Sequence, residues 1–119
     1  LDLEFTPEQI SQEWAVNHLV AIDPAGIIRG VLILQSQDVD GTQVKMRQVA
    51  VDPDIQSHGI GSNLVKFSEA YAKINGAQQF VLNARTTAVK FYKKLGYKTH
   101  GKEFEEVGIP HYKMTKDLI

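Results

Sequence analysis

The stretch Val49-Ala50-Val51-Asp52-Pro53-Asp54-Ile55-Gln56-Ser57-His58-Gly59-Ile60-Gly61-Ser62 determines the predicted fold of this chain. An apolar run ends at a proline and a helical pattern begins after the first glycine, so the stretch predicts a strand, a loop and a helix in that order. Glycines at a helix start leave backbone N–H groups uncovered beside the positive end of the helix dipole. This arrangement favours the binding of a phosphate group.

The helix that follows the glycines is expected over residues 60–74. Its apolar side chains recur at the spacing of one helix face, at Ile60, Leu64, Phe67, Tyr71 and Ile74. Asn75-Gly76 is a typical helix end. Alternation over residues 79–85, with Phe80, Leu82 and Ala84 on one face, then predicts a strand. A strand, helix and strand in succession form a crossover, so strands 44–51 and 79–85 are expected to be parallel.

Two antiparallel strands are expected before the central stretch. Residues 18–22 and 27–35 are apolar and β-rich, and the turn residues Asp23-Pro24-Ala25-Gly26 join them as a hairpin. A polar segment at 36–42 contains Asp40-Gly41, so strand 44–51 should return antiparallel to its neighbour. Further upstream, Thr6-Pro7-Glu8-Gln9 has the capping-box pattern and predicts a short helix through about Trp14.

The C-terminal third is expected to contain a helix and a strand pair. A helix is predicted from about Thr87 to Leu95, with an apolar stripe of Ala88, Phe91, Tyr92 and Leu95. Residues 97–100 and 111–116 should then form an antiparallel pair. The connection between them is expected to be a loop that contains Glu103, Glu105, Glu106 and Gly108.

Composition narrows the classes of function. A chain of 119 residues is most economically one domain, expected here over residues 1–119, and its start at Leu1 rather than Met leaves open a missing extreme N-terminus. The absence of cysteine excludes disulfide scaffolds and thiolate metal sites and is compatible with the expected cytoplasmic location. A net charge of -1 gives no sign of a nucleic-acid partner. No apolar run has the length of a membrane span, so no membrane partner is expected.

Two common phosphate-binding motifs fit the glycine loop poorly. A nucleotide P-loop ends in Gly-Lys-Ser/Thr, whereas Gly61 is followed by Ser62-Asn63. A dinucleotide fingerprint needs a third glycine or alanine where Leu64 stands. A tight loop before a helix, without a ligand, is the remaining structural interpretation of a glycine pair.

Two motifs in the expected order resemble the GNAT superfamily of N-acyltransferases. Gln56-Ser57-His58-Gly59-Ile60-Gly61 matches that family's acyl-CoA loop, Gln/Arg-x-x-Gly-x-Gly/Ala. The segment from Asn83 to Tyr97 is similar to its strand and helix with a Phe-Tyr-x-x-x-Gly-Tyr ending. Residues 104–111, which include Gly-Ile-Pro-His, resemble a small bacterial branch of the superfamily. The resemblance covers roughly Val20 to Leu118.

The resemblance implies the acyl-CoA N-acyltransferase fold. This is an α/β (α+β) domain with a mixed, mostly antiparallel central sheet, flanking helices and a splayed parallel strand pair. It implies acetyl-CoA as cosubstrate, with its pantetheine arm beside the backbone of Val49 and Val51 and bonded by Asn83 from the other side. The pyrophosphate would accept hydrogen bonds from the loop, formed by Gln56, Ser57, His58, Gly59, Ile60, Gly61 and Ser62.

The resemblance also implies catalytic roles. Tyr92 is matched to the residue that donates a proton or hydrogen bond to the departing sulfur, and a core tyrosine is the structural alternative. Many relatives place a glutamate on the strand equivalent to 44–51, but this strand has no carboxylate. Glu106 and His111 are the remaining base candidates, although a solvated loop and a hydrogen-bonded strand histidine would explain them as well. Arg85 could meet phosphate or substrate, or form a salt bridge at the helix start.

The expected function is direct transfer of an acetyl group from acetyl-CoA to a primary amine of a small molecule or peptide. Glu105 and Glu106 suggest a cationic acceptor. Relatives commonly pair, so a homodimer is a further expectation. The scattered histidines show no ligand spacing, and no metal site is expected. A noncatalytic acyl-CoA-binding regulatory module is the main alternative, and a thioester hydrolase is a third interpretation.

Overall fold

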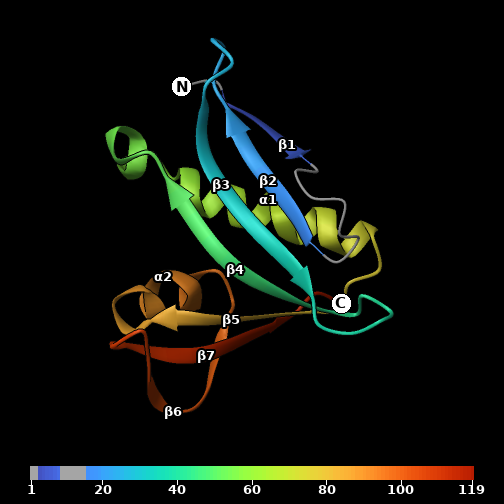
Figure 1. Cartoon of the computed structure of the whole chain (residues 1–119), viewed down its shortest axis with the longest axis vertical. Coiled ribbons are helices and arrows are strands. Elements are labelled where there is room, and N and C mark those ends of the chain that lie inside the picture. The colour runs from blue at the N-terminus through green and yellow to red at the C-terminus, as the bar shows by residue number, and fades with distance from the viewer. Residues whose placement is uncertain (1–2, 9–15) are drawn as a thin grey trace.

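A computed structural model describes residues 3–8 and 16–119 of the chain. This part contains one seven-stranded sheet with the strand order β1-β2-β3-β4-β5-β7-β6 (Figure 1). The strands are β1 (Glu4–Glu8), β2 (Val16–Ile22), β3 (Ile28–Ser36), β4 (Gln43–Val51), β5 (Gln79–Arg85), β6 (Lys98–Glu106) and β7 (Ile109–Asp117). The helices are α1 (Ile60–Ile74) and α2 (Val89–Lys94), preceded by the 3-10 helices η1 (Pro53–His58) and η2 (Thr86–Ala88).

Only one pair of neighbouring strands in this sheet is parallel. β1 to β4 form an antiparallel meander, α1 crosses from β4 to the parallel strand β5, and β7 pairs antiparallel with both β5 and β6. The predicted mixed, mostly antiparallel sheet with a crossover is therefore confirmed. Across the described ranges, no helix has the length and apolar character needed to cross a membrane.

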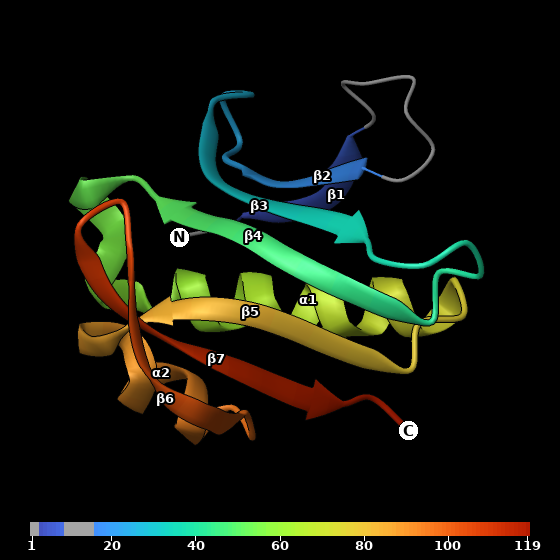
Figure 2. The same ribbon diagram turned by 60° about the horizontal axis from the view of Figure 1, so that its bottom comes forward.

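β4 and β5 are paired at one end and diverge at the other (Figure 2). Their register holds for three residue pairs, from Gln43↔Gln79 to Lys45↔Val81. Beyond this point the register between β3 and β4 shifts, which leaves Arg47 as an extra residue in β4. An extra residue bends its strand. The bulge at Arg47 therefore accompanies the splay between β4 and β5 that the sequence analysis expected.

The core lies between the sheet and α1. Leu64 and Val65 of α1 are fully buried against strand residues such as Leu32, and Ser68 is buried with its hydroxyl donating to the carbonyl of Val65 at 2.6 Å. The predicted apolar face of this helix is correct except at its end, where Ile74 is 85% exposed. A stripe with this spacing drifts around the helix, so its last member has turned away from the sheet.

Two local predictions were wrong, and one predicted helix is present but shorter. Thr6 to Glu8 belong to strand β1 and pair with β2 instead of starting a helix, and the rest of that predicted helix lies outside the described residues. The expected loop with Glu103, Glu105 and Glu106 is strand β6, which reaches a tight turn at Val107-Gly108. The helix expected from Thr87 is shorter, because residues 86–88 form a 3-10 turn before α2.

A carboxylate of α1 joins the C-terminal strands to the core. Glu69 accepts hydrogen bonds from the Tyr97 hydroxyl at 2.8 Å and from Lys116 Nζ at 2.9 Å, and Lys116 Nζ also donates to the carbonyl of Leu95. Burial, together with the charge of Glu69, raises the pKa of Tyr97. The hydroxyl therefore remains a donor at neutral pH.

Replacing this carboxylate should destabilise the fold. Glu69→Ala leaves Tyr97 and Lys116 without their shared acceptor, so the free energy of unfolding is expected to fall by about 2 kcal/mol. Urea denaturation measures the change. Glu105→Ala, at an exposed position of β6, is the matched control and should shift stability by less than about 0.5 kcal/mol. Equal stability of the two variants would contradict this role of Glu69.

Candidate functional site

The glycine loop ends in an uncapped helix start. Gly59 has φ of 72°, a left-handed conformation that glycine adopts without strain, and it serves as the N-cap of α1. No side chain caps this end. The first N–H groups of a helix have no acceptor within the helix. The amides of Ile60, Gly61 and Ser62 are thus open to an anion.

Two contacts hold the segment between β4 and this loop. Asp52 accepts a hydrogen bond from the backbone of Asp54 and pairs with Arg29 at 3.0 Å. The Gln56 side-chain amide donates to the carbonyl of Val51 at 3.0 Å. Both contacts tie η1 to the end of the sheet. The glycine loop is therefore held at the open end of the splay, beside the last residue of β4.

Two cavities that share residues lead from the glycine loop into the splay. The first, the loop cavity, has a volume of about 440 Å³. The second, the splay cavity, has about 570 Å³ and lies between the diverging strands. Their shared residues are Val49, Val51, Gln56, Ala88 and Tyr92. Together they form a path from an anion site to the middle of the sheet.

Tyr92 stands where the two cavities meet. Its ring contacts Phe91 and Tyr97 in edge-to-face geometry, with ring centroids 5.0 and 5.6 Å apart. Burial raises the pKa of the Tyr92 phenol above its ordinary value. The hydroxyl therefore keeps its proton at neutral pH and is a hydrogen-bond donor at this junction.

A polar cluster lines the splay cavity beyond Tyr92. Glu106 accepts a hydrogen bond from Asn83 at 3.2 Å, and its other oxygen lies 3.5 Å from Nε2 of His111. Nδ1 of His111 lies 2.7 Å from the carbonyl of Ile109. Because a carbonyl only accepts, Nδ1 carries the proton and Nε2 is directed toward Glu106. Nε2 and the carboxylate are therefore both proton acceptors, and the pair can take up one proton between them.

The structure brings most of the predicted site residues together. Those that line the two cavities are Val49, Val51, Gln56, Gly59, Gly61, Ser62, Asn83, Tyr92, Glu106 and His111. The side chain of Ile60 is instead buried in the core, so only its backbone is available. The side chains of Ser57 and His58 lie outside the described part. Glu105 does not line the cavity, since neighbouring strand residues point to opposite faces.

The sequence analysis missed the bulge and Arg47, a residue that lines the splay cavity together with Arg85. A signal was present in the strand. Apolar residues alternate at Val44 and Met46 and resume only at Val49 and Val51, so the period of two slips by one residue between them. Such a slip is typical of a bulge.

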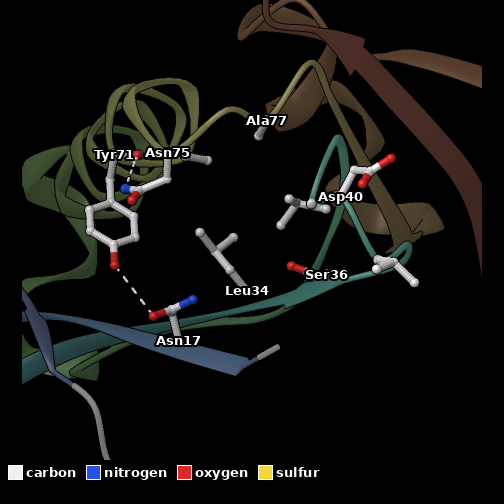
Figure 3. Close-up of a pocket in the computed structure, with 11 residues that line it drawn as sticks. Asn17, Leu34, Ser36, Asp40, Tyr71, Asn75 and Ala77 are labelled. Atoms are coloured by element: carbon white, nitrogen blue, oxygen red, sulfur yellow. Dashed lines mark hydrogen bonds between the residues drawn. The ribbon is translucent and has the colours of Figure 1, made fainter. Parts of the chain in front are cut away.

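A separate cavity of about 380 Å³ lies near the end of α1 (Figure 3). Its described lining includes Asn17 and Asp40. The side chain of Asn17 accepts a hydrogen bond from the Tyr71 hydroxyl at 3.3 Å. None of the predicted site residues lines it. Within residues 3–8 and 16–119, no three His, Asp or Glu residues gather as metal ligands would.

Comparison with known proteins adds sequence relatives. A family model described as an acetyltransferase (GNAT) domain matches residues 4–118. The chain is 45% identical over 74 residues to the uncharacterized N-acetyltransferase YjcF of Bacillus subtilis (strain 168), a match that covers 61% of this chain and 53% of that protein. The chain spans about half the length of the curated relatives it matches.

Solved structures share the fold. An aminoglycoside 6'-N-acetyltransferase complexed with coenzyme A aligns with a TM-score of 0.77 and 19% identity, over 90% of this chain and 75% of that one. A GNAT family acetyltransferase from Elizabethkingia anophelis with acetyl-CoA bound aligns with a TM-score of 0.78 and 17% identity, over 97% of both chains. At such identities the likeness concerns the fold.

Proposed function

Because this chain belongs to the GNAT acetyltransferase family, we propose that it transfers an acetyl group from acetyl-CoA to a primary amine. The observation that carries the proposal is the continuous path from the open amides of α1, past Tyr92, to the Glu106–His111 pair. These are the three kinds of group that the reaction needs. They are N–H groups that donate hydrogen bonds to the phosphates, a hydroxyl that donates to the leaving sulfur, and a base that takes the proton of the amine.

The residues of the loop cavity fit the phosphate end of the coenzyme. Gly61 has no side chain that could cover the backbone N–H groups in the first turn of α1. Gly59, Gly61 and Ser62 all line the loop cavity. A pyrophosphate would accept hydrogen bonds from these amides. The pantetheine arm would continue along Val49 and Val51, where β4 has no β5 partner and can pair with the arm's amides.

The acetyl transfer would take place in the splay cavity. A backbone N–H near Val49 would donate to the thioester carbonyl and stabilise the charge that develops on its oxygen. The amine attacks this carbon, the C–S bond breaks, and the Tyr92 hydroxyl donates to the leaving sulfur. With reference pKa values of about 10 for a phenol and about 8.5 for a thiol, a hydrogen bond is favoured over full proton transfer.

The Glu106–His111 pair would remove the proton from the amine. An alkylammonium has a pKa of about 10.4, so a base is needed near neutral pH. Glu106 is the more exposed partner, with 45% of its side chain accessible against 9% for His111. We therefore assign contact with the amine to Glu106, with His111 supporting it from within the sheet.

Weakening the pair should slow the reaction. Glu106→Gln keeps an acceptor for Asn83 but removes the charge, so kcat/KM near neutral pH is expected to fall about tenfold, with His111 left to accept the proton. Glu105→Gln is the control on the opposite face of β6. An unchanged kcat/KM in Glu106→Gln would exclude this base.

The solved relative that acetylates aminoglycosides supports an amine as acceptor. The alternative of a noncatalytic acyl-CoA-binding module is weakened by the proton-accepting pair in the cavity, which binding alone does not need. Release of thiol from acetyl-CoA across a panel of amines separates the two. Tight binding without turnover on any amine would favour the binding module, and release without amine would favour a hydrolase.

A homodimer remains a prediction for this fold. β6 is an edge of the sheet and eight of its nine residues are exposed, so its outer backbone groups are available for pairing. Static light scattering at two protein concentrations would measure the state in solution. A mass of one chain at both concentrations would exclude the dimer.

A further inference from the structure

Two arginines line the splay cavity. Arg47 is the extra residue of the β4 bulge, and Arg85 is the last residue of β5, directly across from His111 of β7. Both line the splay cavity with Glu106. Arg47 and Arg85 thus approach the same space from the two strands that diverge.

Neither arginine has a carboxylate partner among the described residues. The ion pairs found within residues 3–8 and 16–119 do not include Arg47 or Arg85. Arg29 gives the contrast, because Asp23 and Asp52 hold it at 3.1 and 3.0 Å. Arg47 and Arg85 are both exposed, so no carboxylate in the described part of the chain competes with an anionic ligand for their guanidinium groups.

The phosphate site proposed above and the two arginines belong to different cavities. Gly59, Gly61 and Ser62 line only the loop cavity, and Arg47 and Arg85 line only the splay cavity. A coenzyme bound as proposed would end its arm near Tyr92. An anion beside Arg47 and Arg85 would therefore belong to the acceptor.

We propose that the acceptor is an amine that also carries an anionic group, in the simplest case the carboxylate of an amino acid. The inference rests on the proposed acetyl transfer and names the substrate class of the same site. Arg47 and Arg85 would bind the anionic group, while Glu106 receives the ammonium proton. This differs from the cationic acceptor that the glutamates alone suggested, because Glu105 does not line the cavity and two cations do.

Matched acceptors test the proposal. An amino acid and its carboxamide differ in the anionic group and, through it, in the pKa of the amine, so kcat/KM is compared per unprotonated amine. On that basis the value for the acid should exceed that for the amide about tenfold or more. The panel comprises the standard amino acids, dipeptides, and their amides, with thiol release from acetyl-CoA as the readout. An aminoalkylphosphonate distinguishes a phosphate-like group from a carboxylate, and preference for either anion supports the proposal.

Variants connect the preference to the two arginines. Arg47→Gln and Arg85→Gln should each raise the KM for the acid about tenfold and leave the KM for the amide within about twofold, since an uncharged acceptor does not use them. Lys73→Gln, in the last turn of α1, removes a positive charge outside the cavity and should change neither. Thermal unfolding verifies that the variants are folded.

Two results would overturn different claims. Amides or simple alkylamines used as well as the acids would contradict the anionic acceptor and leave acetyl transfer intact. No thiol release with any amine would contradict the proposed function and the inference with it.

Discussion

Gly61→Asp is expected to weaken acetyl-CoA binding about 100-fold while the fold becomes slightly more stable. A carboxylate in the first turn of α1 would repel the pyrophosphate, a repulsion of several kcal/mol at short range that solvent and salt reduce. The same charge interacts favourably with the helix dipole, by about 0.5 kcal/mol. A Cβ at this position would meet only Phe91 and Val51, at 3.7 Å or more, so the fold accommodates it.

Isothermal titration with acetyl-CoA and thermal unfolding measure the two effects. Gly61→Asn is the matched control, since asparagine has nearly the same size as aspartate without the charge. Its affinity for acetyl-CoA should be about tenfold higher than that of Gly61→Asp. A coenzyme affinity of Gly61→Asp equal to that of the unsubstituted protein would exclude the helix start as the phosphate site.

Tyr92→Phe is expected to lower kcat about 100-fold and to leave the KM for acetyl-CoA nearly unchanged. The phenol would act on the sulfur only as the C–S bond breaks, so its loss affects the transition state more than binding. The ring would keep its edge-to-face contacts with Phe91 and Tyr97. Because burial raises the pKa of Tyr92, the unsubstituted protein should show no loss of kcat from this group below about pH 10.

Steady-state kinetics with a saturating amine give both parameters. Tyr71→Phe is the control, because its hydroxyl bonds Asn17 away from the splay cavity. Equal kcat for Tyr92→Phe and the unsubstituted protein would mean that Tyr92 only packs with its apolar neighbours on helix α2.

The fold was predictable where local pattern and tertiary packing agree. The limits of α1 and β5 were correct because helix and strand periodicities are clear there and turn residues follow or precede them. Thr6 to Glu8 show the opposite case. Their capping pattern is local, whereas pairing with β2 depends on residues ten or more positions away. The turn before β7 was missed because Val107 has φ of 53°, which a β-branched residue rarely adopts.

In the candidate site, too, residues close in sequence could be predicted and those that depend on strand pairing could not. The phosphate end could be predicted because Gly59 and Gly61 lie close in sequence. Glu106 and His111 could be named as candidates, but their contact depends on the β6–β7 hairpin. Arg47 could not be assigned without the register of β4 against β3, which places it in the bulge.

Formation of an acetylated amine from acetyl-CoA tests the central claim most directly. The purified protein, acetyl-CoA and the amine panel would be combined, with free thiol and acetylated product quantified in the same samples by a thiol reagent and mass spectrometry. We predict thiol and acetylated amine in equal amounts, both reduced about 100-fold in rate by Tyr92→Phe. Bound acetyl-CoA without acetylated product from any amine, or thiol released without it, would contradict the assignment of this chain as an N-acetyltransferase.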